Sequence, residues 1–174
     1  SLPIVKSTPT TTAATASAAL TWVTEADTAA FAARLATCPA LRDAYVELRG
    51  NLGAGKTTLV RHLLRALGVQ GRIKSPTYAV VEPYELPGLN IWHFDFYRFS
   101  DPREWADAGF RDIFASPGLK IAEWPDKVAG QLPAADLVVG IEVQDDDMRQ
   151  VAVTAQTAIG LALLAAAQTT TPAA

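Results

Sequence analysis

The spacing of hydrophobic residues divides the first part of the chain into short strands and an amphipathic helix. Leu20–Val23 is a short apolar run typical of a strand. Thr24, followed three residues later by Asp27, is the pattern of a helix N-terminus, and Pro39 lies just beyond the expected end of that helix. Ala44–Leu48 predicts the next strand. The order predicted here is therefore strand, helix, strand.

A second helix is predicted after a glycine-rich segment, because apolar residues recur on one helical face and Gly68 is a natural residue to end it: Leu59, Val60, Leu63, Leu64 and Leu67. Tyr78–Glu85 and Asn90–Tyr97 are rich in β-forming residues and predict a hairpin around Leu86–Gly88. Further along, a short helix is expected to open at Asp101-Pro102.

The second half of the chain predicts three more strands, with Asp145–Asp147 as the turn between the last two: Gly118–Glu123, Leu137–Val143 and Gln150–Thr154. Strand–helix units combined with a hairpin predict an α/β fold, a three-layer sandwich whose mixed β-sheet contains a central antiparallel hairpin. The 174 residues fit one domain, which we place at residues 20–155. Residues 1–19 are predicted to be a flexible tail, and residues 156–174 an Ala/Thr-rich tail in which Ile159–Ala167 could add a short helix.

Composition narrows the classes of function. Hydrophobic residues make up 49% of the chain, enough for a buried core, and the net charge of −3 disfavours direct, tight binding to nucleic acid. A lone cysteine, Cys38, cannot form an internal disulfide, and one cysteine with two histidines argues against a Cys/His zinc site. The longest apolar runs are far shorter than the ~20 residues that span a bilayer. We therefore expect a cytoplasmic protein without a membrane association.

Residues 50–57 match the phosphate-binding pattern G-x-x-x-x-G-K-[ST] at each fixed position. The segment follows an apolar strand and opens an amphipathic helix, so backbone N–H groups and the helix N-terminus can together surround an anion. Lys56 is then placed to reach the β and γ phosphates, and the Thr57 hydroxyl to bind Mg²⁺. This predicts a P-loop NTPase-like fold, with ATP and Mg²⁺ as cofactors and these nucleotide-binding residues: Asn51, Leu52, Gly53, Ala54, Gly55, Lys56, Thr57 and Thr58.

Two acidic residues end apolar strands, where a carboxylate on the metal side of a nucleotide is expected. Asp95 closes the run that starts at Ile91, as in a Walker B segment. Glu123 closes the next predicted strand. From spacing alone, a role at the metal and a plain acidic residue on the surface are equally good interpretations of Glu123. His93 shares a strand face with Asp95, and we interpret it as a packed strand histidine rather than a base.

Ser75–Tyr78 lies between the second helix and the hairpin. In P-loop switch proteins, a threonine in this position closes over the γ-phosphate and Mg²⁺, which makes Thr77 the candidate. Position alone leaves open a simple Ser-Pro turn that enters a strand. Trp124, beside Glu123, is a candidate to line the nucleotide pocket, with a core or interface role as the alternative.

The chain resembles the bacterial TsaE (YjeE) proteins in the order and content of four segments: Gly50–Thr58, Ser75–Tyr78, His93–Arg98 and Glu123–Pro125. These are P-loop ATPases needed for the threonylcarbamoyl modification of the adenosine beside the tRNA anticodon. The resemblance covers about Leu20 to Thr154 and does not extend to either end of the chain.

The resemblance implies roles for individual residues. Thr57 and Glu123 are expected to bind Mg²⁺, and Asp95 to act on the metal and water side during hydrolysis. Thr77 is expected to sense the γ-phosphate. Contacts with the nucleotide base are implied near the start of the first helix, at Thr24 or Thr28, and Arg149 is implied as a late basic residue near the nucleotide.

The resemblance also implies partners. The ATPase would bind TsaD- and TsaB-like proteins and hydrolyse ATP slowly alone, while tRNA would be held mainly by those partners. A small-molecule kinase and a non-catalytic nucleotide-dependent binding module remain alternatives. A GTPase is disfavoured because the chain has no N-K-x-D segment, and an ABC-type subunit because it has no L-S-G-G-Q segment.

Overall fold

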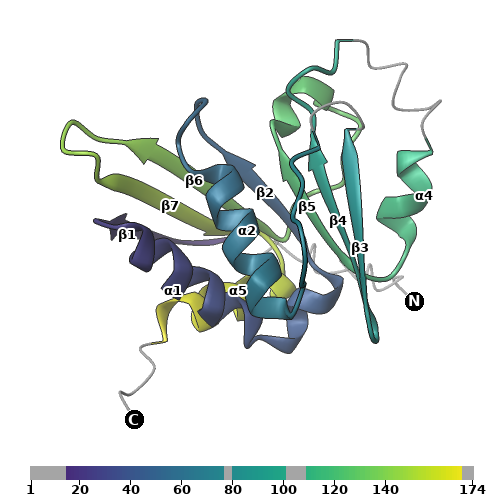
Figure 1. Ribbon diagram of the computed structural model, residues 1–174, viewed down its shortest axis with the longest axis horizontal. Coiled ribbons are helices and arrows are strands. Elements are labelled where there is room, and N and C mark those ends of the chain that lie inside the picture. Colours follow the sequence, from purple (N-terminus) through teal and green to yellow (C-terminus); the bar gives the residue numbers. More distant parts are fainter. Residues whose placement is uncertain (1–14, 77–79, 101–108, 170–174) are drawn as a thin grey trace, which may run out of the picture.

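Within the described residues, seven strands form a single mixed sheet in the order β1-β7-β6-β2-β5-β4-β3 (Figure 1). The computed structural model describes residues 15–76, 80–100 and 109–169. The strands are β1 (Ala16–Trp22), β2 (Tyr45–Arg49), β3 (Val81–Leu86), β4 (Leu89–Asp95), β5 (Leu119–Glu123), β6 (Leu137–Val143) and β7 (Arg149–Ala155).

The four strands β6, β2, β5 and β4 are parallel, whereas β1, β7 and β3 pair antiparallel with their neighbours. Parallel strands end at the same edge of a sheet, and ligands of open α/β sheets bind beyond that edge. The segments that follow β2, β4 and β5 therefore emerge side by side. The glycine-rich segment starts at the end of β2, Asp95 lies at the end of β4 and Glu123 lies at the end of β5.

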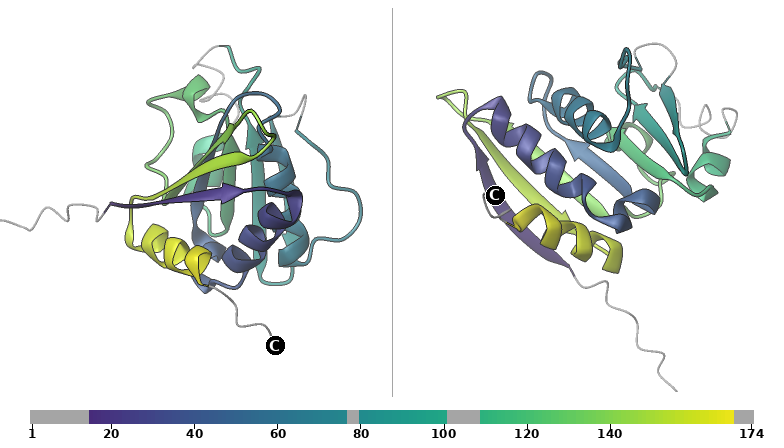
Figure 2. Two further views of the ribbon diagram at one scale, coloured as in Figure 1. Left: turned by 90° about the vertical axis from the view of Figure 1, so that its left-hand side faces the viewer. Right: turned by 60° about the horizontal axis from the view of Figure 1, so that its bottom comes forward.

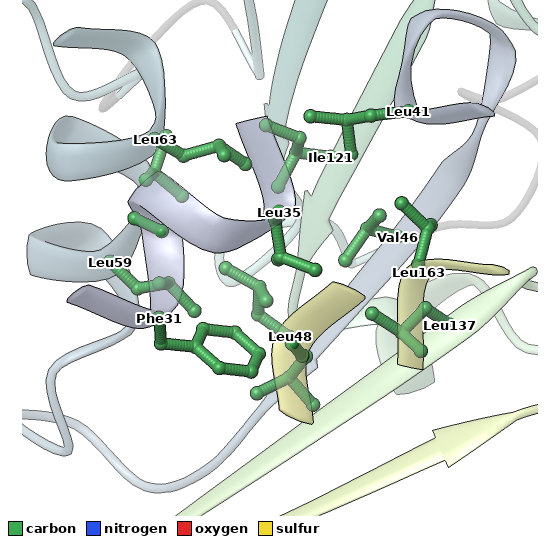
Figure 3. Packing of buried hydrophobic residues seen from close by; sticks show 14 of the residues in the cluster. Phe31, Leu35, Leu41, Val46, Leu48, Leu59, Leu63, Ile121, Leu137 and Leu163 are labelled. Atoms are coloured by element: carbon green, nitrogen blue, oxygen red, sulfur yellow. The ribbon is translucent and has the colours of Figure 1, made fainter. Parts of the chain in front are cut away.

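Three helices cover one face of the sheet: α1 (Glu25–Ala36), α2 (Lys56–Leu67) and α5 (Ala158–Gln168), as the right-hand view of Figure 2 shows. Their apolar sides meet the inward residues of β2, β5 and β6, and Phe31, Leu35, Leu59 and Leu163 are among the fully or almost fully buried side chains (Figure 3). A 3-10 helix, η1 (Pro39–Asp43), leads into β2. The α1 N-terminus is capped by the Asp27 carboxylate, which accepts the backbone N–H groups of Val23 and Thr24.

The opposite face is covered by α4 (Phe110–Ala115) and the 3-10 helix η2 (Pro125–Val128). An aromatic cluster fills the space between them and the sheet, with the Phe94 ring 5.4 Å from that of Phe96 and 5.5 Å from that of Phe110. The predicted α/β fold with three layers and a mixed sheet is thus confirmed. Neither α4 nor η2 was predicted, because both are short: α4 has six residues and η2 has four.

The predicted hairpin forms, but at one edge of the sheet rather than at its centre. β3 pairs with β4 alone, from Val81↔Phe94 to Leu86↔Leu89. Pro83 lies inside β3 and has no N–H to give to a further strand, so β3 suits an edge. That proline was the sequence signal against a central position.

The fold also extends past the predicted limits of residues 20–155. β1 starts at Ala16 and pairs with β7 along its whole length. Residues 16–19 therefore belong to the sheet and not to the predicted tail of residues 1–19. Beyond residue 155, helix α5 buries Leu163 completely against the core. Its N-cap, Thr157, accepts the N–H of Gly160 and donates to the Asp136 carboxylate at 2.6 Å. The short helix expected at Ile159–Ala167 therefore forms, but it packs on the core and does not belong to a tail.

The short helix expected at Asp101-Pro102 lies outside the described residues, as do Thr77 and Tyr78 of the Ser75–Tyr78 segment. Within the described part of the chain, none of the helices is long and apolar enough to cross a membrane.

Truncating a buried side chain of α5 tests whether this helix belongs to the folded unit. Leu163→Ala should lower the free energy of unfolding by about 2–5 kcal/mol, because it opens a cavity beneath the helix. Ala162→Gln, on the exposed side of the same helix, should change it by less than about 0.5 kcal/mol. Urea denaturation measures both. Equal, negligible effects would show that α5 is not part of the cooperative fold.

Candidate phosphate-binding site

The loop between β2 and α2 is built on glycines whose backbone other residues rarely adopt. Gly50 and Gly55 have φ angles of +150° and +108°. A Cβ on Gly50 would lie 2.5 Å from the carbonyl oxygen of Ile141, and one on Gly55 would lie 3.0 Å from Arg149 Nε. The loop can therefore follow this path only without side chains at these positions, which exposes its backbone to a ligand.

A cleft of about 240 Å³ lies beside this loop, at the carboxyl ends of β2, β4 and β5. Its lining combines loop residues with side chains from the ends of three other strands: Leu52, Gly53, Ala54, Gly55, Lys56, Thr57, Thr58, Asp95, Tyr97, Glu123, Trp124 and Arg149. Helix α2 starts at Lys56, so its first unpaired N–H groups and the positive end of its dipole are directed at this region.

Lys56 is the buried cation of the cleft, with 5% of its surface exposed. Its Nζ donates to the carbonyl oxygen of Gly50 and lies 3.8 Å from the centroid of the Trp124 ring. Burial lowers the pKa of the Lys56 ammonium, while the nearby Glu123 and Asp95 carboxylates act in the opposite direction. The ammonium is thus held over the loop by a carbonyl and an aromatic face.

Glu123 is the buried anion, 2% exposed. The Thr57 hydroxyl donates towards both of its carboxylate oxygens, at 3.2 and 3.3 Å, and His93 Nε2 lies 2.6 Å from Oε2. A buried carboxylate is costly unless it is paired and hydrogen-bonded. This one combines partners from α2 and β4 with the nearby charge of Lys56.

Asp95 ends β4 directly beside Glu123, its partner in the β4–β5 register. One carboxylate oxygen accepts the backbone N–H of Tyr97 at 3.0 Å. Partial burial raises the pKa of the Asp95 carboxyl, and the Tyr97 N–H partly offsets that effect. A cation placed beside Asp95 would favour the ionised form of its carboxyl.

The turn after β5 places an aromatic wall on the cleft. Trp124 adopts a left-handed backbone, with φ at +56°, before Pro125 begins η2. Its ring packs against that of Tyr97, with centroids 4.9 Å apart. Across the loop, Arg149 Nε donates to the carbonyl oxygen of Ala54 at 2.7 Å, which holds the guanidinium against the glycine segment.

The structure brings most of the predicted site residues together. Seven of the eight loop positions, with Asp95, Glu123, Trp124 and Arg149, line the cleft, and Asn51 precedes them in the loop. Thr24 is the exposed N-cap of α1 and Thr28 is buried in that helix, and neither lines the cleft. Their contact with a base stays a prediction, as does the role of Thr77, which lies outside the described residues.

One lining residue and one supporting contact were missed. Tyr97 was not singled out, although it lies in the His93–Arg98 segment of the resemblance. His93 was interpreted as a packed strand residue, and it is buried, but it also bonds Glu123. Its two-residue spacing from Asp95 was the available clue, since it puts both on the face towards α2.

The donor set suits a hard cation such as Mg²⁺. Thr57, Glu123 and Asp95 offer oxygen atoms, whereas the described residues contain no cluster of three or more His, Cys, Asp or Glu side chains arranged to hold a metal ion by themselves. Mg²⁺ is typically held by one or two carboxylates together with substrate phosphates. The residues present therefore fit an ion that arrives with a phosphate ligand.

Comparison with known proteins agrees with this geometry. The family model described as threonylcarbamoyl adenosine biosynthesis protein TsaE matches residues 22–151. The chain belongs to the TsaE family. The tRNA threonylcarbamoyladenosine biosynthesis protein TsaE of Haemophilus influenzae is 46% identical to this TsaE-family chain over 121 residues, which are 70% of this chain and 76% of the relative.

More distant relatives agree. The protein of the same name from Bacillus subtilis is 35% identical over 108 residues, 62% of this chain and 67% of the relative. The crystal structure of Bacillus subtilis YdiB aligns with a TM-score of 0.72 and 27% identity, covering 88% of this chain and 95% of that chain. The predicted family is thus confirmed, and with it involvement of the family in tRNA threonylcarbamoyladenosine biosynthesis.

Removing the buried ammonium tests whether the loop binds phosphate. Lys56→Ala should weaken ATP binding at least tenfold, because charge-assisted hydrogen bonds contribute about 1.5–3 kcal/mol each. Arg61→Ala, which removes an exposed cation from the same helix, should leave the affinity unchanged. Isothermal titration calorimetry measures both, with circular dichroism to check the fold. Unchanged ATP affinity in Lys56→Ala would exclude phosphate binding at this loop.

Proposed function

We propose that this protein is a Mg²⁺-dependent ATPase that supports threonylcarbamoyl modification of the adenosine beside the tRNA anticodon. It would do so by binding and cycling a complex of TsaD- and TsaB-like proteins. The observation that carries the proposal is one cleft in which Lys56, the Thr57–Glu123 contact and Asp95 converge beside a glycine loop.

The loop and its lysine provide the phosphate end of the site. Backbone N–H groups at the start of α2 favour an anion, and Lys56 adds a full positive charge next to them. In the described structure that charge is engaged with the Gly50 carbonyl and the Trp124 face. A triphosphate would offer it stronger, charge-assisted partners.

The carboxylates provide the metal end. Thr57 and Glu123 would hold Mg²⁺, with Asp95 on the side of the attacking water. Bound Mg²⁺ neutralises charge that develops on the phosphates during hydrolysis. Asp95 stands beside Glu123 at the strand ends, and its backbone bond to Tyr97 fixes one carboxylate oxygen. Among the residues that the structure describes, the other oxygen accepts no hydrogen bond and could orient a water molecule.

The charge of the chain supports an indirect relation to tRNA. With a net charge of −3, the protein lacks the overall positive charge that supports autonomous nucleic-acid binding. A regulatory ATPase whose partners hold the tRNA is compatible with this charge. The proposed ATPase would be slow alone and faster with its partners.

Charge-removing substitutions separate binding from hydrolysis. Glu123→Gln and Asp95→Asn keep the side-chain shape but remove a carboxylate from the metal side. Each should reduce ATP hydrolysis by at least about tenfold, a loss in the range seen when metal-site groups are removed, and leave nucleotide binding without Mg²⁺ nearly unchanged. Phosphate release and calorimetry in EDTA measure the two. Full partner-stimulated turnover in Glu123→Gln would exclude Glu123 as a metal ligand.

A second measurement separates the proposed function from its alternatives. Phosphate release is measured with ATP alone, with candidate metabolites and with a purified TsaD–TsaB complex. We expect the rate to rise when the complex is added. Phosphorylation of a metabolite would indicate a kinase, and tight ATP binding without turnover would indicate a binding module.

Partner affinity should also be about 5–150-fold higher with a non-hydrolysable ATP analogue than with ADP, which corresponds to a coupling of about 1–3 kcal/mol. Equal affinities would exclude nucleotide control of the complex.

A further inference from the structure

A buried histidine supports the proposed metal ligand from behind. The side chains of His93 and Glu123 are 1% and 3% exposed, and His93 Nε2 lies 2.6 Å from Glu123 Oε2. The two residues project from adjacent parallel strands, β4 and β5, towards the face covered by α2. The contact is short enough for a strong hydrogen bond to a charged acceptor.

The other ring nitrogen, His93 Nδ1, is buried and has no hydrogen-bond partner among the residues that the structure describes. Within that part of the chain, Glu123 is therefore the hydrogen-bond partner that orients the imidazole ring.

We propose that His93 is a positioning residue, whose Nε2–H bond fixes the Glu123 carboxylate in the orientation that faces Thr57 and the cation. The inference rests on the proposed function, because the cation is the one that accompanies ATP. Glu123 has two oxygens but a flexible side chain, and the Thr57 hydroxyl, at 3.2 and 3.3 Å, does not discriminate between them. His93 engages Oε2 alone and removes that ambiguity.

A hydrogen bond from behind orients a ligating carboxylate towards its cation. Partners of this kind behind a metal ligand typically change metal affinity or activity by about 10–100-fold when they are lost.

The positioning role is tested with two amides of different reach. The amide nitrogen of glutamine in His93→Gln can occupy about the place of Nε2, whereas the shorter side chain in His93→Asn ends near the place of Nδ1. We expect His93→Asn to need about 10–100-fold more Mg²⁺ for half-maximal strengthening of ATP-analogue binding. His93→Gln should remain close to the wild type, and ADP binding in EDTA should be unchanged in both.

The surface pair of His62 and Glu25, 2.9 Å apart, is the matched control. His62→Asn should leave the Mg²⁺ dependence unaltered. Equal losses in His93→Gln and His93→Asn would reduce His93 to a packing residue, and wild-type behaviour in His93→Asn would remove its positioning role. If the wild type itself shows no Mg²⁺-dependent ATP binding, the proposed function fails and the positioning role fails with it.

Discussion

The parallel pairing of β2, β5 and β4 is the constraint on which the site depends. In register, Asp95 lies beside Glu123, and β2 delivers the glycine loop to the same edge of the sheet. Residues more than 70 positions apart in the chain thereby meet in one cleft. The helices on one face and the aromatic cluster on the other pack against these strands and hold them in register, although the segments that follow the strands are loops.

Burial of opposite charges is the second theme. Lys56 and Glu123 are both nearly inaccessible to water, yet they do not bond each other. Each has its own local partners instead: a carbonyl and an indole ring for Lys56, a hydroxyl and an imidazole for Glu123. Such partners offset part of the cost of burying a charge. They also leave both charges available for a ligand that carries phosphate and a cation.

The aromatic turn after β5 links the site to the opposite layer of the fold. Trp124 covers Lys56 on one side, while Pro125 and Val128 of η2 are buried on the other face of the sheet. Arg49 of β2 forms ion pairs with both Glu47 and the exposed Asp126 of η2. The position of the indole ring over the lysine is therefore set by packing on both sides of the sheet.

The sequence by itself determined the elements whose signals are local. The glycine loop, the amphipathic helix α2, the capped start of α1 and the acids at two strand ends each follow from a few neighbouring residues, because backbone conformation and helical period are local properties. The tertiary structure alone decided the rest. The edge position of the hairpin, the packing of the Ala-rich α5 and the His93–Glu123 bond depend on strand order and on contacts between distant residues. A single sequence does not encode strand order in any local pattern, since register and neighbours are chosen by the burial of the whole sheet.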